Sequence, residues 1–376
     1  MSTRIILSSL LAPALLVAVA AADTIYTTDG HTIDDCSVLE ESLTEVSYKR
    51  NSKKTTIPAG DVLRIDFTTT PGSGRQDLTL IDRAETAVRD DQLFDAVSDF
   101  TTFLDGAVSK MADGGKLRPV WAPAYAAWRL AELNASMGKT AEAVAAVQLL
   151  EDKFPEARYI PAALLLKAEA QFAAGEAAPA KKSLAAVKKL VAAKGLSKRW
   201  ELEANLSGVV NDDALTGDKR RDALKRISNQ AGSEFASVRN RAQVIGAESL
   251  LADKDYEGAQ EVFTRIVKDS KSDQRTLAIA WSGTGDCLFE SISKNPGSDA
   301  NRKTLNAALR AYMRVVVLYK AESDYLARSM VYAGRIYTLM ETEAATENAK
   351  KLFGTVTRQF PKTKWAQEAR GFARKG

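Results

Sequence analysis

The stretch that decides the fold is APAYAAWRLAELNASMGKTAEAVAAVQLLEDKFP, residues 122 to 155. Its apolar residues recur at the three- and four-residue spacing of amphipathic helices, and Gly138 interrupts them. Small residues, Ala131 and Ala143, stand on either side of that interruption, and Pro155 closes the stretch because proline cannot continue a helix. The pattern predicts two helices joined by a tight turn.

The same pattern returns along the chain at a fixed distance. Five residues of a second copy each follow their counterparts by 37 residues: Ala168, Gly175, Ala180, Leu184 and Val187. A constant displacement over five positions predicts a repeated structural unit. Related spacings occur before and after these copies, whereas residues 197–230 keep a helical pattern but lose the small residues. We interpret that segment as a degenerate pair whose role stays open.

The spacing of small residues, with a closing proline, resembles a tetratricopeptide repeat. The resemblance covers residues 78–376 in about seven helical pairs, with a closing helix from Lys364 to Lys375. It implies a mainly α protein, a right-handed α-solenoid of helix-turn-helix repeats in which each pair buries its face against its neighbours. The family's tryptophan and leucine-glycine signature is poorly kept, and other α-solenoid families remain an alternative.

Residues 23–68 follow a different pattern, with period two and many Thr, Ile, Val and Tyr residues, which is typical of strands. Asp29-Gly30 fits a tight hairpin turn, and Asn51 to Lys54 fits a polar turn. About five short strands predict a small β-barrel domain. The pattern resembles the SH3-like or Sm-like β-domains at the front of exported bacterial repeat proteins. This resemblance implies a domain that packs or binds and does not catalyse.

The first 22 residues have the features of a secretory signal peptide. Arg4 precedes an apolar run from Ile5 to Val19, and three alanines precede Asp23. We predict cleavage after Ala22 and an exported, bacterial protein of the periplasm or cell envelope. Retention of the segment as a membrane anchor is the alternative. After cleavage we expect no integral membrane span, because no other stretch reaches roughly 18 apolar residues.

Residues 69–77, TTPGSGRQD, predict a flexible linker between the β-domain and the repeats, because they are rich in Thr, Gly, Ser and Pro. Apolar residues make up 45% of the chain and charged residues 27%, as in soluble globular proteins. The net charge of +4 is spread among interspersed acidic and basic residues, so we expect no nucleic-acid partner. The basic run Lys219 to Arg221 predicts a solvated helix face, with a binding patch as the alternative.

The residues for catalysis or metal binding are sparse. His31, the sole histidine, stands beside the predicted hairpin turn, so a Ser-His-Asp or Cys-His arrangement could use only that side chain. Cys36 and Cys287 are expected to be two separate thiols, and their spacing suggests no metal site. We expect no cofactor and no enzymatic activity. Carboxylate-dependent hydrolysis is the weaker alternative, which a pair of carboxylates in a deep pocket would favour.

An acidic residue follows the small residue of the first helix in five copies: Glu85, Glu132, Glu169, Glu248 and Asp286. The resemblance implies that these first helices line a concave surface, where aligned carboxylates would attract a basic or amide-rich partner. The alternative is that each carboxylate pairs with a lysine or arginine of a neighbouring helix. Gly334-Arg335 breaks the series in the last copy.

Three aromatic residues share one face of the first helix in the opening stretch: Trp121, Tyr125 and Trp128. Core packing explains them, and a platform for a partner is the alternative, in which Tyr125 and Trp128 contact a protein or peptide. Together these features predict a non-catalytic scaffold or adaptor that binds protein partners through the solenoid surface. A structural component that self-associates through its repeat ends is the alternative.

Overall fold

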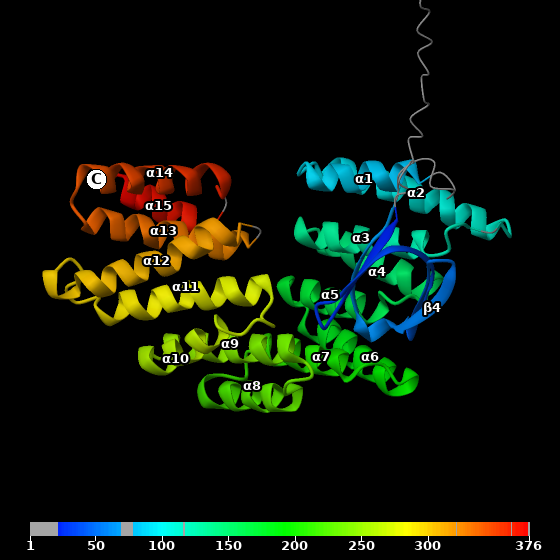
Figure 1. Ribbon diagram of the computed structural model, residues 1–376, viewed down its shortest axis with the longest axis horizontal. Helices are drawn as coiled ribbons and strands as arrows, with labels where there is room; N and C mark the ends of the chain where they lie inside the picture. Colours follow the sequence, from blue (N-terminus) through cyan, green and yellow to red (C-terminus); the bar gives the residue numbers. More distant parts are fainter. Residues whose placement is uncertain (1–21, 69–77, 116, 321, 362, 375–376) are drawn as a thin grey trace, which may run out of the picture. The chain divides into compact units, whose positions relative to one another are not determined.

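The computed structural model describes residues 22–68, 78–115, 117–320, 322–361 and 363–374. Within these residues, five strands precede fifteen α-helices (Figure 1). The chain divides into two compact units, Met1–Glu176 and Ala177–Gly376. The predicted class, a mainly α protein of paired helices after a small β-domain, is confirmed. The predicted signal segment up to residue 21 and the predicted linker lie outside the described residues, and both stay predictions.

The strands form one antiparallel sheet in the order β4-β3-β2-β1-β5. Their bounds are β1 (Asp23–Thr27), β2 (Thr32–Glu41), β3 (Glu45–Arg50), β4 (Lys53–Pro58) and β5 (Val62–Asp66), with a turn of 3₁₀ helix at Ala59–Asp61. The long strand β2 pairs with β1 through its first half and with β3 through its second half. The sheet curls in Figure 1, with β4 and β5 as its edge strands.

Both predicted turns of the sheet are present. Gly30 has a φ of 88° between β1 and β2, a conformation that glycine adopts without steric cost. The exposed side chain of His31 lies in the same turn. Asn51 and Ser52 have φ values of 49° and 64° between β3 and β4, as a two-residue hairpin turn requires.

Helices of the first unit follow the sheet. They are α1 (Thr79–Arg89), α2 (Leu93–Ala112), α3 (Ala122–Ser136), α4 (Thr140–Lys153) and α5 (Ile160–Ala173). The opening stretch of the sequence forms α3, its turn and α4, as predicted. Helix α2 continues past Gly106 to Ala112. The buried Leu104 and Ala107 keep its apolar stripe intact past the glycine.

The second unit consists of helices and their connections, with one further 3₁₀ turn at Asp299–Asn301. The helices are α6 (Ala177–Lys194), α7 (Lys198–Val210), α8 (Gly217–Ala231), α9 (Ala236–Ala252), α10 (Tyr256–Ile266), α11 (Gln274–Ser291), α12 (Arg302–Leu318), α13 (Ser323–Leu339), α14 (Glu343–Gln359) and α15 (Lys364–Ala373). The degenerate pair corresponds to α7 and α8, and α15 is the predicted closing helix.

A left-handed residue ends the first helix of most pairs. Gly138 and Gly175 have this conformation after α3 and α5, with φ values of 72° and 80°. Asp91, Lys254 and Glu341 take the same place in other pairs, with φ values of 60°, 65° and 53°. Non-glycine residues therefore make the same turn, which explains why the glycine signature is weak in the sequence.

Small residues and aromatic rings pack against each other where helices of the second unit cross. Phe263, Tyr312 and Phe353 are buried on second helices. A Cβ atom added to Gly285 would lie 2.7 Å from the Tyr312 ring, and one added to Gly334 would lie 2.6 Å from the Phe353 ring. Close packing thus requires these glycines, and it also requires Gly283, where an added Cβ would lie 2.4 Å from the Phe263 ring.

Substitution of Gly334 by alanine tests this packing. We expect Gly334→Ala to lower the free energy of unfolding by about 1–3 kcal/mol, because the new methyl group displaces the Phe353 ring. Urea unfolding followed by circular dichroism measures the change. The control is Gly246→Ala in α9, where nothing lies within 4 Å of the added Cβ. That variant should gain up to about 1 kcal/mol from helix propensity. Equal effects of the two variants would contradict the packing argument.

Candidate partner-binding faces

Tyr125 and Arg129 of α3 hold the first two carboxylates of the predicted series, Glu85 and Glu132. Glu85 of α1 accepts a hydrogen bond of 2.6 Å from the Tyr125 hydroxyl and one of 2.7 Å from Arg129 Nε, both of α3. Arg129 also donates to Glu132 Oε2 at 3.0 Å. The Arg129 guanidinium therefore bridges two carboxylates of the predicted acidic series, Glu85 and Glu132.

A similar arrangement joins the β-domain to α5 and the residues before it. Glu41 of β2 forms an ion pair with Arg158 and accepts a hydrogen bond of 2.9 Å from the Tyr159 hydroxyl. The Glu41 side chain is 3% exposed and that of Arg158 is 12% exposed. This buried contact attaches the sheet to the helices of the first unit. No pattern in the sequence indicated a role for Glu41, because this residue lies outside the repeats.

The predicted aromatic platform faces the chain's own residues. The Tyr125 ring lies edge-on to Phe67, which follows β5, and the Phe67 ring stacks on Trp121 with centroids 3.7 Å apart. Trp128 is half-buried and stacks on Tyr159 at 6.1 Å. Packing therefore accounts for these rings, and part of the surface expected for a partner contacts the β-domain instead. Partner binding by Tyr125 and Trp128 stays a prediction.

In the second unit, Asp286 of α11 has the same kind of surroundings. It accepts a hydrogen bond of 2.7 Å from the Tyr312 hydroxyl of α12 and forms an ion pair with Arg328 of α13. The Asp286 side chain is 3% exposed, so one buried carboxylate ties three helices together. The pairing alternative thus describes Glu85 and Asp286, whereas Glu132 pairs with Arg129 of its own helix. These three carboxylates do not form an unpaired acidic surface.

The two remaining carboxylates of the series, Glu248 and Glu169, differ in their surroundings. Glu248 of α9 is half-buried and hydrogen-bonds the hydroxyl of Tyr325 from α13. Glu169 is exposed on α5. The structure thus brings Glu85, Glu132, Tyr125 and Trp128 together in the first unit, and places Glu248 and Asp286 around Arg328 in the second.

Burial changes the acidity of several of these groups. Loss of water raises the pKa of Glu132, with Arg129 opposing the change. Burial likewise raises the pKa of Glu248 and of Asp286, and Arg328 opposes it at both. Because a buried carboxylate is costly unless it is paired, each arginine is needed for the fold.

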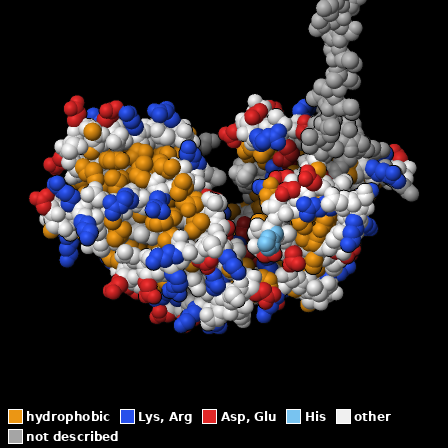
Figure 2. Space-filling view, viewed as in Figure 1, with side chains coloured by type: hydrophobic (Ala, Val, Ile, Leu, Met, Phe, Trp, Pro, Cys, Tyr) orange, Lys and Arg blue, Asp and Glu red, His pale blue; other side chains and the backbone are white. Residues whose placement is uncertain are grey.

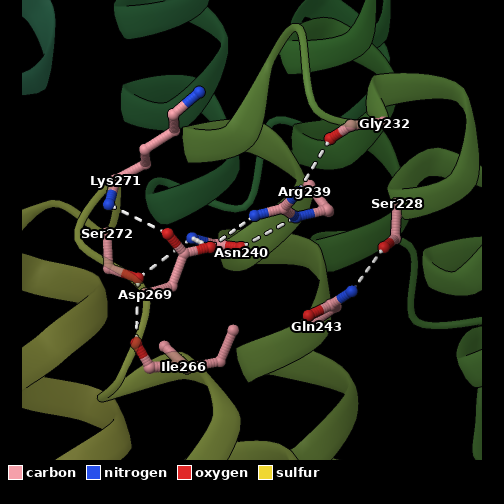
Figure 3. A network of polar contacts seen from close by, with 9 residues as sticks. All are labelled: Ser228, Gly232, Arg239, Asn240, Gln243, Ile266, Asp269, Lys271 and Ser272. Carbon is pink, nitrogen blue, oxygen red and sulfur yellow. Dashed lines mark hydrogen bonds and ion pairs between the residues drawn. The ribbon is translucent and has the colours of Figure 1, made fainter.

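A polar network on the α10–α11 connection braces the second unit (Figure 3). Asp269 forms an ion pair with Arg239 and accepts hydrogen bonds of 3.0 Å from the Asn240 amide and 2.9 Å from the Lys271 backbone. Partial burial opposes ionisation of Asp269, but these donors hold its pKa below the usual range. Asn240 also donates to Ser272 at 2.9 Å. The network holds the connection against α9 and leaves no donor of Asn240 for a ligand.

A partly exposed stripe on α13 is the surface that the sequence analysis missed. Tyr325, Arg328, Tyr332 and Arg335 recur at spacings of three and four, between residues that are buried. The Arg335 guanidinium lies 4.8 Å from the Tyr332 ring centroid, 5.0 Å from that of Phe289 and 5.2 Å from that of Phe372. The break in the acidic series at Arg335 was the sequence signal for this site.

Arg335 also differs from its neighbours in its ion pairing. Within the described ranges, no carboxylate lies within 4.0 Å of its guanidinium, whereas Arg328 is paired with Asp286. A cation over aromatic rings is stabilised by their negative faces, and a guanidinium can also form charge-assisted hydrogen bonds with a carboxylate.

In the described part of the chain, no three His, Cys, Asp or Glu side chains lie close enough together to hold a metal ion. None of the described helices has the length and apolarity needed to cross a membrane. The cysteines are buried as two separate thiols, as predicted, and burial raises the pKa of Cys287 to about 12.

No protein-family model matches the chain, and no curated protein matches it. Among solved structures, a tetratricopeptide repeat protein from Parabacteroides merdae has a TM-score of 0.43 and 14% identity, over 79% of this chain and 96% of that one. The TPR domain of P58(IPK) has a TM-score of 0.31 and 16% identity, over 79% of this chain and 77% of that one. Yeast Tom70 has a TM-score of 0.23 and 12% identity, over 76% of this chain and 69% of that one. The helical-repeat fold of this chain rests on the helix pairs described above.

Removal of the Glu41 carboxylate tests the attachment of the β-domain. We expect Glu41→Ala to lower the free energy of unfolding by about 3–5 kcal/mol, because it leaves the buried Arg158 uncompensated. Denaturant unfolding measures the loss. As a control, Glu261→Ala breaks an ion pair with Arg265 in which the side chains are 81% and 59% exposed, and should cost less than about 1 kcal/mol. A loss as small as the control's would show that Glu41 does not hold the domain.

The raised pKa of Glu248 predicts a pH dependence. The folded protein holds this proton more tightly than the unfolded chain, so stability present below the ordinary glutamate pKa is lost as pH rises through the raised value. Glu248→Gln keeps an acceptor for Tyr325. We expect its stability to equal that of the wild type in acid and to exceed it at neutral pH, as measured by urea unfolding across that range.

The control for this prediction is Glu347, whose pKa is shifted in the opposite direction. A hydrogen bond from Lys351 lowers the pKa of the exposed Glu347, so stability from that group is present above the ordinary glutamate pKa and lost in acid. Glu347→Gln should therefore be slightly less stable than the wild type at neutral pH. A difference for Glu248→Gln that does not change with pH would contradict the assignment.

Proposed function

We propose that this protein is a non-catalytic scaffold that binds a protein partner through the α13 stripe of the second unit, defined by Tyr325, Arg328, Tyr332 and Arg335. The observation that carries the proposal is the Arg335 guanidinium, held over three aromatic rings with no acidic partner within 4.0 Å in the described residues. A carboxylate of a partner protein would supply the missing charge, and an apolar side chain beside it would cover the rings.

The first unit offers an example of such a contact. There, Arg158 lies over the Tyr159 ring at 4.4 Å and pairs with Glu41, which belongs to a separate small domain. An arginine on an aromatic ring thus already holds a carboxylate from another part of this chain. Arg335 presents the same combination without that carboxylate.

The surface of the second unit also supports association with a protein. In Figure 2, hydrophobic side chains gather over the region where Figure 1 labels α11, α12 and α13, and lysine and arginine side chains lie among them. Val317 and Leu318 of α12 are 58% and 60% exposed. Apolar surface bordered by charge is typical of protein-binding sites.

Three observations favour binding over catalysis. His31 is exposed in a turn, and the carboxylates Glu85 and Asp286 are each occupied by an arginine and a tyrosine. A scaffold needs neither a general base nor a nucleophile. Self-association remains the alternative that the experiment below separates from binding of another protein.

Export is part of the proposal. Arg4, the apolar run after it and the alanines before Asp23 support a cleaved signal peptide and a place in the bacterial periplasm or cell envelope. The SH3-like or Sm-like character of the β-domain is likewise proposed. Its strand order and the 3₁₀ turn before β5 support that assignment.

Site-specific photo-crosslinking tests the proposed function. With benzoylphenylalanine in place of Tyr332, we expect a discrete adduct with another protein in the native cell. Arg335→Glu should abolish that adduct, because it reverses the charge that holds the partner's carboxylate. The matched control is Arg370→Glu, which reverses an exposed arginine of α15 and should leave the adduct intact.

Two outcomes would contradict the proposal. An adduct that consists only of two copies of this chain would favour self-association. Equal loss of the adduct in the Arg335→Glu and Arg370→Glu variants would show that the general charge of the surface, and not the aromatic arginine site, determines binding.

A further inference from the structure

A groove in the second unit lies outside the α13 stripe. It runs between α6 and α8, with α7 as its base, and has a volume of about 490 Å³. We use the word floor for five of its lining residues, four of them with apolar side chains: Leu184, Gly208, Val209, Leu215 and Ile227. A volume of this size accommodates several side chains of a bound segment.

At Gly208, α7 places no side chain in the groove. A Cβ added to Gly208 would meet a single neighbour, Leu184 at 3.5 Å, which is an ordinary contact. At Gly285 and Gly334 an aromatic ring occupies the space above the glycine. The pair α7 and α8 has Ile227 four residues after Ala223, where α10 and α12 carry Phe263 and Tyr312. The space above Gly208 is thus not filled by an aromatic ring, unlike the space above Gly285 and Gly334.

The rim of the groove is basic. Lys181, Lys188 and Arg226 line it and are exposed, and none of them has an ion pair within 4.0 Å in the described part of the chain. Five lysines and no acidic residue occur in α6: Lys181, Lys182, Lys188, Lys189 and Lys194. Asp212 is the acidic residue of the lining, and its carboxylate accepts a hydrogen bond from the Ala214 backbone.

We propose that this groove binds an acidic segment of a partner protein whose apolar side chains enter between α6 and α8. The unpaired cations of the rim complement carboxylates on the segment, and the floor removes its apolar side chains from water. A nucleic acid would use the cations but leave the recessed apolar floor empty. The site is separate from the α13 stripe, so either one can fail without the other.

Fluorescence anisotropy with a defined probe tests the proposal. The probe is a labelled peptide in which glutamate pairs flank leucines, and it is added to the full chain. We expect saturable binding that the double variant Lys188→Glu, Arg226→Glu weakens about tenfold or more, because both rim charges are reversed. Gly208→Leu should weaken binding to a similar extent, since its side chain fills the floor. Thermal unfolding of each variant verifies that it is folded.

The matched control reverses two charges on the same helices that do not line the groove. Lys189→Glu, Lys225→Glu should keep the affinity within about twofold of the wild type. A second peptide, with serine in place of each leucine, should bind at least about tenfold more weakly at equal charge.

Four results would overturn the proposal. They are no binding of the probe, equal weakening by the rim and control variants, equal affinity for the serine peptide, and tight binding of a single-stranded oligonucleotide that the rim variant abolishes. The last would assign the surface to a nucleic acid.

Discussion

The fold depends on buried or half-buried carboxylates that are each held by one tyrosine hydroxyl and one arginine. In the described structure Glu41, Glu85 and Asp286 have these surroundings. A carboxylate moved out of water costs several kcal/mol, and a guanidinium with a second donor recovers that cost only in one geometry. Each group therefore fixes which segments meet. Glu41 joins the sheet to the residues that begin α5, Glu85 joins α1 to α3, and Asp286 joins α11, α12 and α13.

Packing between helices is less selective than these polar contacts, and the two act at different places. The helix crossings use small residues against aromatic rings, as at Gly334 and Phe353. Such contacts resemble one another from pair to pair, so they stabilise a stack without specifying its order. Hydrogen bonds between charged groups are directional. An incorrect packing arrangement would therefore cost free energy, because it would leave an arginine buried and unpaired. The repeats thus combine a common packing rule with individual polar contacts.

The sequence predicted the helices and the turns well, because periodicity and glycine reflect local physics. Ala131, Gly138 and Ala143 identified the helical pair, and Asp29-Gly30 identified the first hairpin. The environment of the acidic residues was less accessible. Arg129 stands 44 residues after Glu85, and Arg328 stands 42 residues after Asp286, so each partner lies one repeat further along. Both separations differ from the 37-residue displacement of the best copies, so a search for opposite charges at that displacement would have found neither pair. The contact of Glu41 with Arg158 could not be found that way either, because the sheet has no repeat.

The same chemistry explains why the two units offer different surfaces. In the first unit, Phe67 and Glu41 of the β-domain contact Trp121, Tyr125, Arg158 and Tyr159, so aromatic and basic groups there already have partners within the chain. In the second unit, Arg335 lies on its aromatic rings without such a carboxylate in the described residues. A partly buried cation of this kind contributes little to folding, since it forgoes water and gains only the ring faces. Under the proposed function, Arg335 contributes to binding, because a carboxylate of a partner protein would pair with it. In the first unit, Glu41 of the chain itself pairs with Arg158 in this way.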